Sequence, residues 1–200
     1  LTAAELEKRK CELRAKDDEL KAKAQRMDEL DAKLRAQSNA MSALRQKVTD
    51  ALVNFNAEDL TVTLKDGKVY VSLSEKLLFA SGSAAVDPKG KVALGKLAEV
   101  LRANTDINVM VEGHTDTIPI RTSSFKDNWD LSTARATSIV RLLTTTYSVP
   151  PLNVVAAGRS EFMPVAGNST TEGRARNRRT EIILVPKLDE LFELVGDQQP

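Results

Sequence analysis

The chain of 200 residues carries 29 basic and 28 acidic side chains, so its net charge is close to zero, and this argues against nucleic-acid binding, which needs a clustered basic excess. Aromatic residues make up only 4% of the chain, too few for a surface on which bases or sugars stack. One cysteine excludes an internal disulfide, and the sequence shows neither a secretory signal nor an apolar run of roughly 20 residues, the length that spans a bilayer.

Residues 1–55 contain neither glycine nor proline and are rich in residues that favour helix. Apolar side chains recur at every seventh position of this segment: Leu6, Leu13, Leu20, Met27, Leu34, Met41, Val48 and Phe55. A sustained seven-residue repeat is typical of a coiled coil. We therefore predict a helical stalk over residues 1–55 that pairs with a second copy, weakly at its N-terminal end because the intervening seam positions are mostly polar. A solvated single helix is the alternative.

Residues 56–200 are predicted to form one globular domain. From Leu60 the apolar period changes to two, and Asp66-Gly67 separates two alternating runs, which indicates a β-hairpin. Apolar spacing then predicts helices over residues 89–104, 131–147 and 188–195, strands at INVMVEG, NVVAAG and TEIILV, and a loop over 161–177. The expected fold class is α+β: a long N-terminal helix, then a small two-layer domain with both central helices on one face of a mixed sheet.

The stretch VEGHTDTIPI holds the only histidine, His114, between Glu112 and Asp116. A catalytic zinc site takes three ligands from His, Cys, Asp or Glu, and neither HxxxH nor CxxC spacing accompanies this histidine. A serine triad would need a G-x-S-x-G elbow, which the sequence lacks. A carboxylate pair for glycoside cleavage stays open on sequence alone, although few aromatics are present to line a cleft. We predict no metal, no cofactor and no enzymatic activity, with His114 hydrogen-bonded to backbone.

Asp116 and Arg135 suggest a different chemistry. Asp116 follows a predicted strand, and Arg135 lies near the start of the second central helix. An arginine is unexpected there because the helix dipole favours anions at its N-terminus. It is explained if the helix start and the guanidinium together hold the carboxylate of a ligand. From spacing alone, an Asp116–Arg135 salt bridge that only fixes the loop is an equal alternative.

Three sequence blocks then occur in order: G-H-T-D at residues 113–116, N-x-x-L-S-x-x-R-A at 128–136 and G-R-A-x-N-R-R at 173–179. Over residues 75–186 the chain resembles the OmpA-like peptidoglycan-binding domain, which is also found in peptidoglycan-associated lipoprotein and in the flagellar stator protein MotB. The resemblance implies a βαβαβ-type domain that holds the cell-wall peptide without catalysis.

The resemblance also implies a ligand and its binding residues. The ligand is the diaminopimelate of the stem peptide, whose free end carries an ammonium and a carboxylate. Asp116 is expected to bind the ammonium, and Arg135 the carboxylate through two parallel N–H bonds that a lysine could not match. Around them we expect backbone donors near Thr117 and Leu131, an asparagine that orients the loop, Asn128, and a residue that braces the loop or rim, Arg179.

The sequence hypothesis is thus a non-enzymatic wall anchor in the periplasm of a Gram-negative envelope, dimeric through its stalk. Since the chain begins at Leu1 rather than methionine, we expect an upstream segment that fixes it to a membrane, the outer one. One alternative is the foot of a MotB-like flagellar stator. Another is a coiled-coil scaffold whose globular end binds proteins and has lost affinity for the wall.

Overall fold

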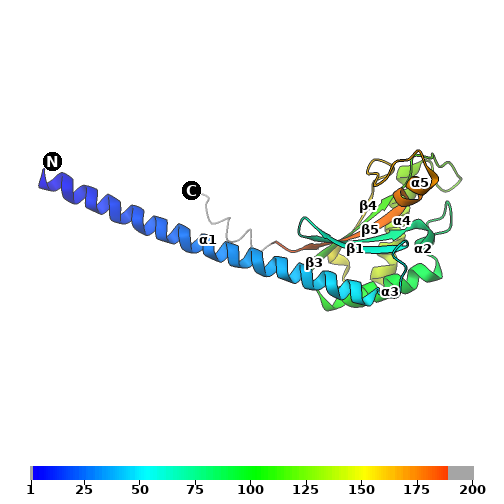
Figure 1. Ribbon diagram of the computed structural model, residues 1–200, viewed down its shortest axis with the longest axis horizontal. Helices are drawn as coiled ribbons and strands as arrows, with labels where there is room; N and C mark the ends of the chain where they lie inside the picture. The colour runs from blue at the N-terminus through cyan, green and yellow to red at the C-terminus, as the bar shows by residue number, and fades with distance from the viewer. Residues whose placement is uncertain (1, 189–200) are drawn as a thin grey trace. The chain divides into compact units, whose positions relative to one another are not determined.

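The computed structural model describes residues 2–188 of the chain (Figure 1). Its elements follow in the order α1 (Ala3–Ala51), β1 (Leu60–Lys65), β2 (Lys68–Ser74), α2 (Glu75–Leu78), α3 (Pro88–Ala103), β3 (Ile107–His114), α4 (Asn128–Arg141), the π-helical turn η1 (Leu142–Thr146), the 3-10 turn η2 (Pro151–Asn153), β4 (Val154–Gly158), α5 (Thr171–Asn177) and β5 (Arg179–Pro186). The predicted α+β class, with a long first helix and a mixed sheet, is confirmed.

The helix α1 contributes to two compact units, one that includes the chain up to Ala40 and one that comprises residues Met41–Lys187. In the first unit the apolar heptad positions are solvent-exposed, from 48% to 72%: Leu6, Leu13, Leu20, Met27 and Leu34. In the second unit the same heptad series continues with Met41 and Val48, which are buried. The repeat therefore serves two different environments along one helix.

The last turns of α1 belong to the core of the globular unit. Met41, Leu44 and Val48 of α1, with Leu52 directly after its end, are spaced three or four residues apart, the spacing that places side chains on one helix face. All four join a single hydrophobic cluster with the sheet and with α3 and α4. Four side chains of the core thus precede residue 55, where the sequence suggests the boundary between stalk and domain.

The sheet has the order β1-β2-β5-β3-β4, and all neighbouring pairs are antiparallel except β3 and β4. The predicted hairpin is confirmed as β1 and β2. Asp66 and Gly67 both have positive φ values, of 51° and 70°, as a two-residue turn between right-twisted strands requires.

Alternation along the strands gives the sheet two different faces. The apolar residues Val69, Val71, Leu73, Val111 and Ile182 pack into the core, where α3 and α4 cover the same face, as predicted. Residues of the other parity, including Tyr70, Ser72 and Glu181, line an open groove. The polar face of the sheet and the loops beyond its end therefore form the accessible surface.

Two details differ from the sequence prediction. The loop expected over 161–177 contains α5, which begins where the Thr170 side chain accepts a hydrogen bond from the Gly173 amide. The helix expected from 131 begins at Asn128, because the Asp127 side chain caps it by accepting from the Asp130 amide. The helix expected over 188–195 lies, from residue 189 on, outside the described residues. Within residues 2–188, no helix combines the length and apolar character that membrane crossing requires.

Candidate ligand-binding site

Asp116 and Arg135 line the same open groove, which has a volume of about 1690 Å³. Asp116 lies two residues after the end of β3, and its Oδ1 accepts a hydrogen bond of 2.9 Å from the Ile118 amide. Arg135 projects from α4. Both side chains are largely buried, with relative exposures of 5% and 2%. The structure thus brings the two predicted residues to one concavity.

The two residues are linked indirectly, through a chain of ion pairs that we call the charge network: Asp116, Arg178, Glu75 and Arg135. Arg178 Nη1 donates to Asp116 Oδ2 at 2.6 Å, and Arg178 Nε donates to Glu75 Oε2 at 2.5 Å. Arg135 Nη2 donates to Glu75 Oε1 at 2.5 Å. The direct Asp116–Arg135 salt bridge is therefore replaced by a row of alternating charges, with Asp116 and Arg135 at its two ends.

Arg135 is held on three sides. Its Nε donates to the Ser83 carbonyl at 2.8 Å, and its guanidinium lies 4.9 Å from the centre of the Phe79 ring. An aromatic face and a carboxylate both stabilise a buried cation. Arg178 is more exposed; burial lowers its pKa, but hydrogen bonds to Asp116 and Glu75 outweigh burial and raise it. The Arg178 guanidinium therefore stays charged.

Asn128 connects the loop after β3 to the start of α4. Its Nδ2 donates to the carbonyls of Asp116 and Ile118, at 3.2 and 3.1 Å, and to Glu161 Oε2 at 2.9 Å. Its Oδ1 accepts from the Ile120 amide at 3.3 Å. These bonds fix the backbone that carries Asp116, so the geometry agrees with the orienting role expected for Asn128.

The other three predicted residues, Leu131, Thr117 and Arg179, differ in their position relative to the groove. Leu131 lines the groove, but its amide donates to the Asp127 carbonyl within the first turn of α4. Thr117 is exposed and is not among the residues that line the groove. Arg179 is buried, and it donates to Glu181 and to the Met163 carbonyl, which braces the segment before α5. Contact of these three residues with a ligand stays a prediction.

Sequence reasoning missed Glu75 and Arg178 as central members of the charge network. Arg178 lies in the third motif block beside Arg179, and this position in a motif is the sequence feature that could have identified it as a site residue. Glu75 carries no local signal, because it follows β2 directly and its partners are 60 and 103 residues away.

His114 ends β3 and is 2% exposed. Burial lowers the pKa of its imidazole to about 3, and the positive charges of Arg179 and Arg159 act in the same direction. The ring is therefore neutral at physiological pH. The expected hydrogen bond to backbone is absent: neither ring nitrogen has a hydrogen-bond partner among the described residues.

Known proteins share this architecture. Motility protein B of Bacillus subtilis (strain 168) is 34% identical over 131 residues, which cover 66% of this chain and 47% of that protein. A putative MotB-like protein from Desulfovibrio vulgaris has a similar structure, with a TM-score of 0.68, 26% identity, and coverage of 76% of this chain and 96% of that chain. The cell wall anchor of the T6SS from Pseudomonas aeruginosa gives a TM-score of 0.64, 36% identity, and coverage of 70% and 97%.

The chain spans about half the length of the curated relatives it matches. Residues 78–178, just over half of the 200 residues, match the model of the OmpA family. Three of the four members of the charge network, Asp116, Arg135 and Arg178, lie within that match. The chain belongs to the OmpA family.

Proposed function

We propose that this chain binds peptidoglycan non-covalently, through the diaminopimelate of the stem peptide, and so anchors an envelope protein to the cell wall. The observation that carries the proposal is the alternation of charge in one groove, from Asp116 to Arg135. A diaminopimelate end that is free of cross-links presents an ammonium and a carboxylate on one carbon. Such a zwitterion matches a row of alternating charges without adding net charge to a partly buried site.

Each end of the charge network retains capacity for a ligand. A carboxylate has about four acceptor positions, and Asp116 uses one oxygen for Ile118 and the other for Arg178. A guanidinium has five N–H donors, and Arg135 gives one to Ser83 and one to Glu75. Asp116 is therefore proposed to accept from the ligand ammonium, and Arg135 to donate to the ligand carboxylate.

The neighbouring groups hold the two binding residues in position. Phe79, Ser83 and Glu75 hold the Arg135 guanidinium in place before any ligand arrives, and Asn128 holds the Asp116 backbone. A preordered site loses less conformational entropy on binding. Likeness to the Pseudomonas cell wall anchor, at 36% identity, supports the same assignment. The proposal includes no catalytic step.

Wall binding is tested by sedimentation with purified sacculi. We expect Asp116→Ala and Arg135→Ala each to weaken binding by about 10–100-fold, because each removes a charged hydrogen bond worth roughly 1.5–3 kcal/mol. Asp106→Ala and Arg141→Ala are matched controls, since both are exposed, and they are expected to bind like the parent chain. Parental binding by both site variants would contradict the proposal, and release of soluble muropeptides would identify a hydrolase instead.

We further propose that the chain works in the periplasm, as a homodimer, attached to a membrane, the outer one, through a segment upstream of Leu1. The exposed apolar stripe from Leu6 to Leu34 supports pairing, because it places five large side chains at seven-residue spacing in solvent. Two paired wall sites would gain avidity from their linkage.

Pairing predicts a concentration-dependent dimer in sedimentation equilibrium. We expect the double variant Leu13→Ser, Leu20→Ser to dissociate at protein concentrations at least about tenfold higher than the parent chain, because each change removes roughly 1.5–3 kcal/mol of apolar burial at the seam. Changing the exposed Val53, which lies outside the stripe, to serine is expected to leave the association constant unchanged. A parent chain that is monomeric at every concentration would exclude the dimer.

A second candidate is the foot of a flagellar stator, favoured by the 34% identity to Motility protein B. In that case the same groove binds the wall, and the full protein converts ion flow into motion. The protein segment that precedes Leu1 would then contain a transmembrane helix with an acidic residue. Absence of that helix from the full-length sequence would remove this candidate and leave the wall anchor.

A further inference from the structure

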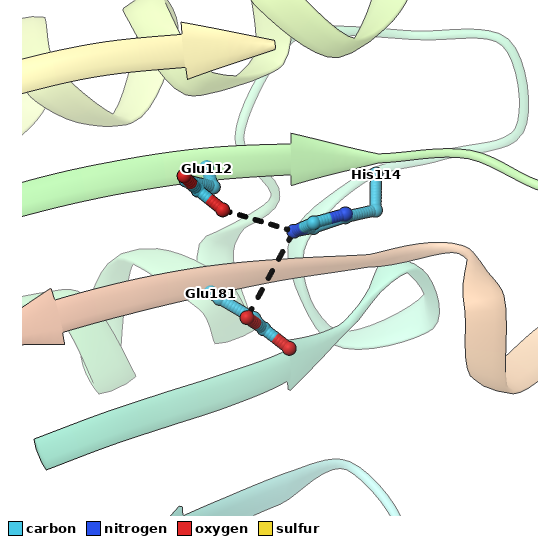
Figure 2. Close-up of side chains that lie close together, drawn as sticks. All are labelled: Glu112, His114 and Glu181. Carbon is cyan, nitrogen blue, oxygen red and sulfur yellow. Dashed lines mark ion pairs between the residues drawn. The ribbon is translucent and has the colours of Figure 1, made fainter. Parts of the chain in front are cut away.

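A second cluster of ligand-type side chains lies outside the charge network. Glu112 and His114 project from β3, and Glu181 projects from the adjacent strand β5, where it is the direct cross-strand partner of Glu112. Figure 2 shows one nitrogen of the His114 imidazole directed at both carboxylates. His114 Nε2 lies 3.6 Å from Glu112 Oε2 and 3.9 Å from Glu181 Oε2.

These separations exceed the range of a hydrogen bond. Within the described residues neither nitrogen of the His114 ring has a hydrogen-bond partner, although the side chain is only 1% exposed. A buried polar atom without a partner costs about 1–3 kcal/mol. A group that sits between Nε2 and both carboxylates would remove that cost for Nε2. We propose that Glu112, His114 and Glu181 form a binding site for a zinc ion.

The distances agree with this ion. Two ligand atoms that each lie about 2.1 Å from zinc are about 3.4 Å apart at the tetrahedral angle and at most about 4.2 Å apart. The pairs that include His114 Nε2 fall between these limits, at 3.6 and 3.9 Å. All three ligand atoms lie within 4.8 Å of one another, so a small rotation of the partly exposed Glu181 side chain completes the triangle.

Two arginines orient the carboxylates of the proposed zinc site. Arg159 pairs with Glu112 Oε1 and Arg179 with Glu181 Oε1, both at 2.7 Å, so each arginine leaves the Oε2 atom directed toward His114. Ligating carboxylates are commonly oriented by such outer partners. His114 Nε2 has no hydrogen-bond partner among the described residues, so it is available to a metal ion. The two positive charges reduce the affinity for a cation, which favours reversible binding.

The donor set favours zinc over magnesium and calcium. One imidazole nitrogen with two carboxylates suits zinc, whereas magnesium and calcium prefer oxygen ligands alone. Three protein ligands leave a fourth position for water. Glu181 also lines the groove, which gives an ion a route from solvent. Spacing along the sequence could not reveal this site, because Glu181 joins the other two residues only through the pairing of β3 with β5.

The zinc site shares no residue with the charge network, so it can be tested apart from wall binding. The test uses the untagged full chain with Cys11→Ser, because Cys11 is exposed and thiolates also bind zinc. His114 is the only histidine, so ¹⁵N-histidine labelling reports its two ring nitrogens alone. On titration with zinc chloride we expect the Nε2 resonance to move with 1:1 saturation and the Nδ1 resonance to move less.

Variants then identify the other ligands. Glu112→Gln and Glu181→Gln keep the side-chain shape and are each expected to weaken zinc binding by at least about tenfold. The exposed Glu99→Gln serves as the matched control and is expected to bind zinc like its parent. The proposal is overturned if millimolar zinc leaves the Nε2 resonance of the folded parent unchanged. It is also overturned if both glutamine variants, shown to be folded by thermal unfolding, retain the parental affinity.

Discussion

Deleting residues 1–55 is expected to unfold the globular unit, whereas deleting residues 1–40 is expected to leave it folded. The shorter deletion removes only side chains that lie outside the core. The longer one also removes Met41, Leu44, Val48 and Leu52, which are between 0% and 4% exposed. Truncating one large core side chain costs roughly 2–5 kcal/mol. The combined loss of all four side chains is as large as the whole free energy of unfolding of a typical domain, about 5–15 kcal/mol.

Urea denaturation followed by circular dichroism distinguishes the two deletions. We expect the chain that starts at Met41 to keep a cooperative transition, and the chain that starts at Asn56 to lack one. The point variant Val48→Ala should lower the midpoint in the intact chain, while the exposed Val53→Ala should change the free energy of unfolding by less than about 0.5 kcal/mol. A cooperative, undiminished transition for the chain from Asn56 would contradict this account and support a boundary at residue 55.

Replacing Glu75 by alanine is expected to destabilise the domain by about 3–5 kcal/mol, because removal of one partner of a buried ion pair leaves the other charge uncompensated. Glu75 accepts from both Arg135 and Arg178. Arg135 contributes most of the penalty, since its side chain is 3% exposed and cannot regain water, whereas that of Arg178 is 31% exposed.

The free energy of unfolding from urea titration measures this effect. Glu75→Gln keeps a carbonyl oxygen as acceptor, so its loss should be smaller than that of Glu75→Ala but still larger than 1 kcal/mol. The exposed Glu99→Ala is the matched control and should stay within about 0.5 kcal/mol of the parent. A loss below 1 kcal/mol in Glu75→Ala would mean that the two arginines find other partners, and that the charge network is not the unit we describe.

Features with a local cause could be predicted from the sequence. The hairpin follows from Asp66-Gly67, because these residue types accept the positive φ values that the turn needs. The helices α3 and α4 follow from apolar spacing. The short helix α5 was missed, because seven residues that include Gly173 give too little periodicity, and a side-chain cap at Thr170 starts it.

Features that depend on pairing between distant segments could not be predicted in this way. Asp116 and Arg135 were identified, but their connection through Glu75 and Arg178 exists only when the start of α2, the residue between α5 and β5, and α4 are brought together. The seven-residue repeat in α1 gave no indication that its final positions enter the core, because Met41 and Leu34 have the same periodicity and differ only in what lies beside them.

The charge network joins residues that are 60, 62 and 103 positions apart in the chain. An incompletely folded chain therefore has no such row of charges, and whatever binds the row selects the native state. By mass action, a ligand at a hundred times its dissociation constant would add about 2.7 kcal/mol to the free energy of unfolding. Excess ligand would thus protect the chain from proteases that attack unfolded molecules, and protease resistance would rise with ligand concentration.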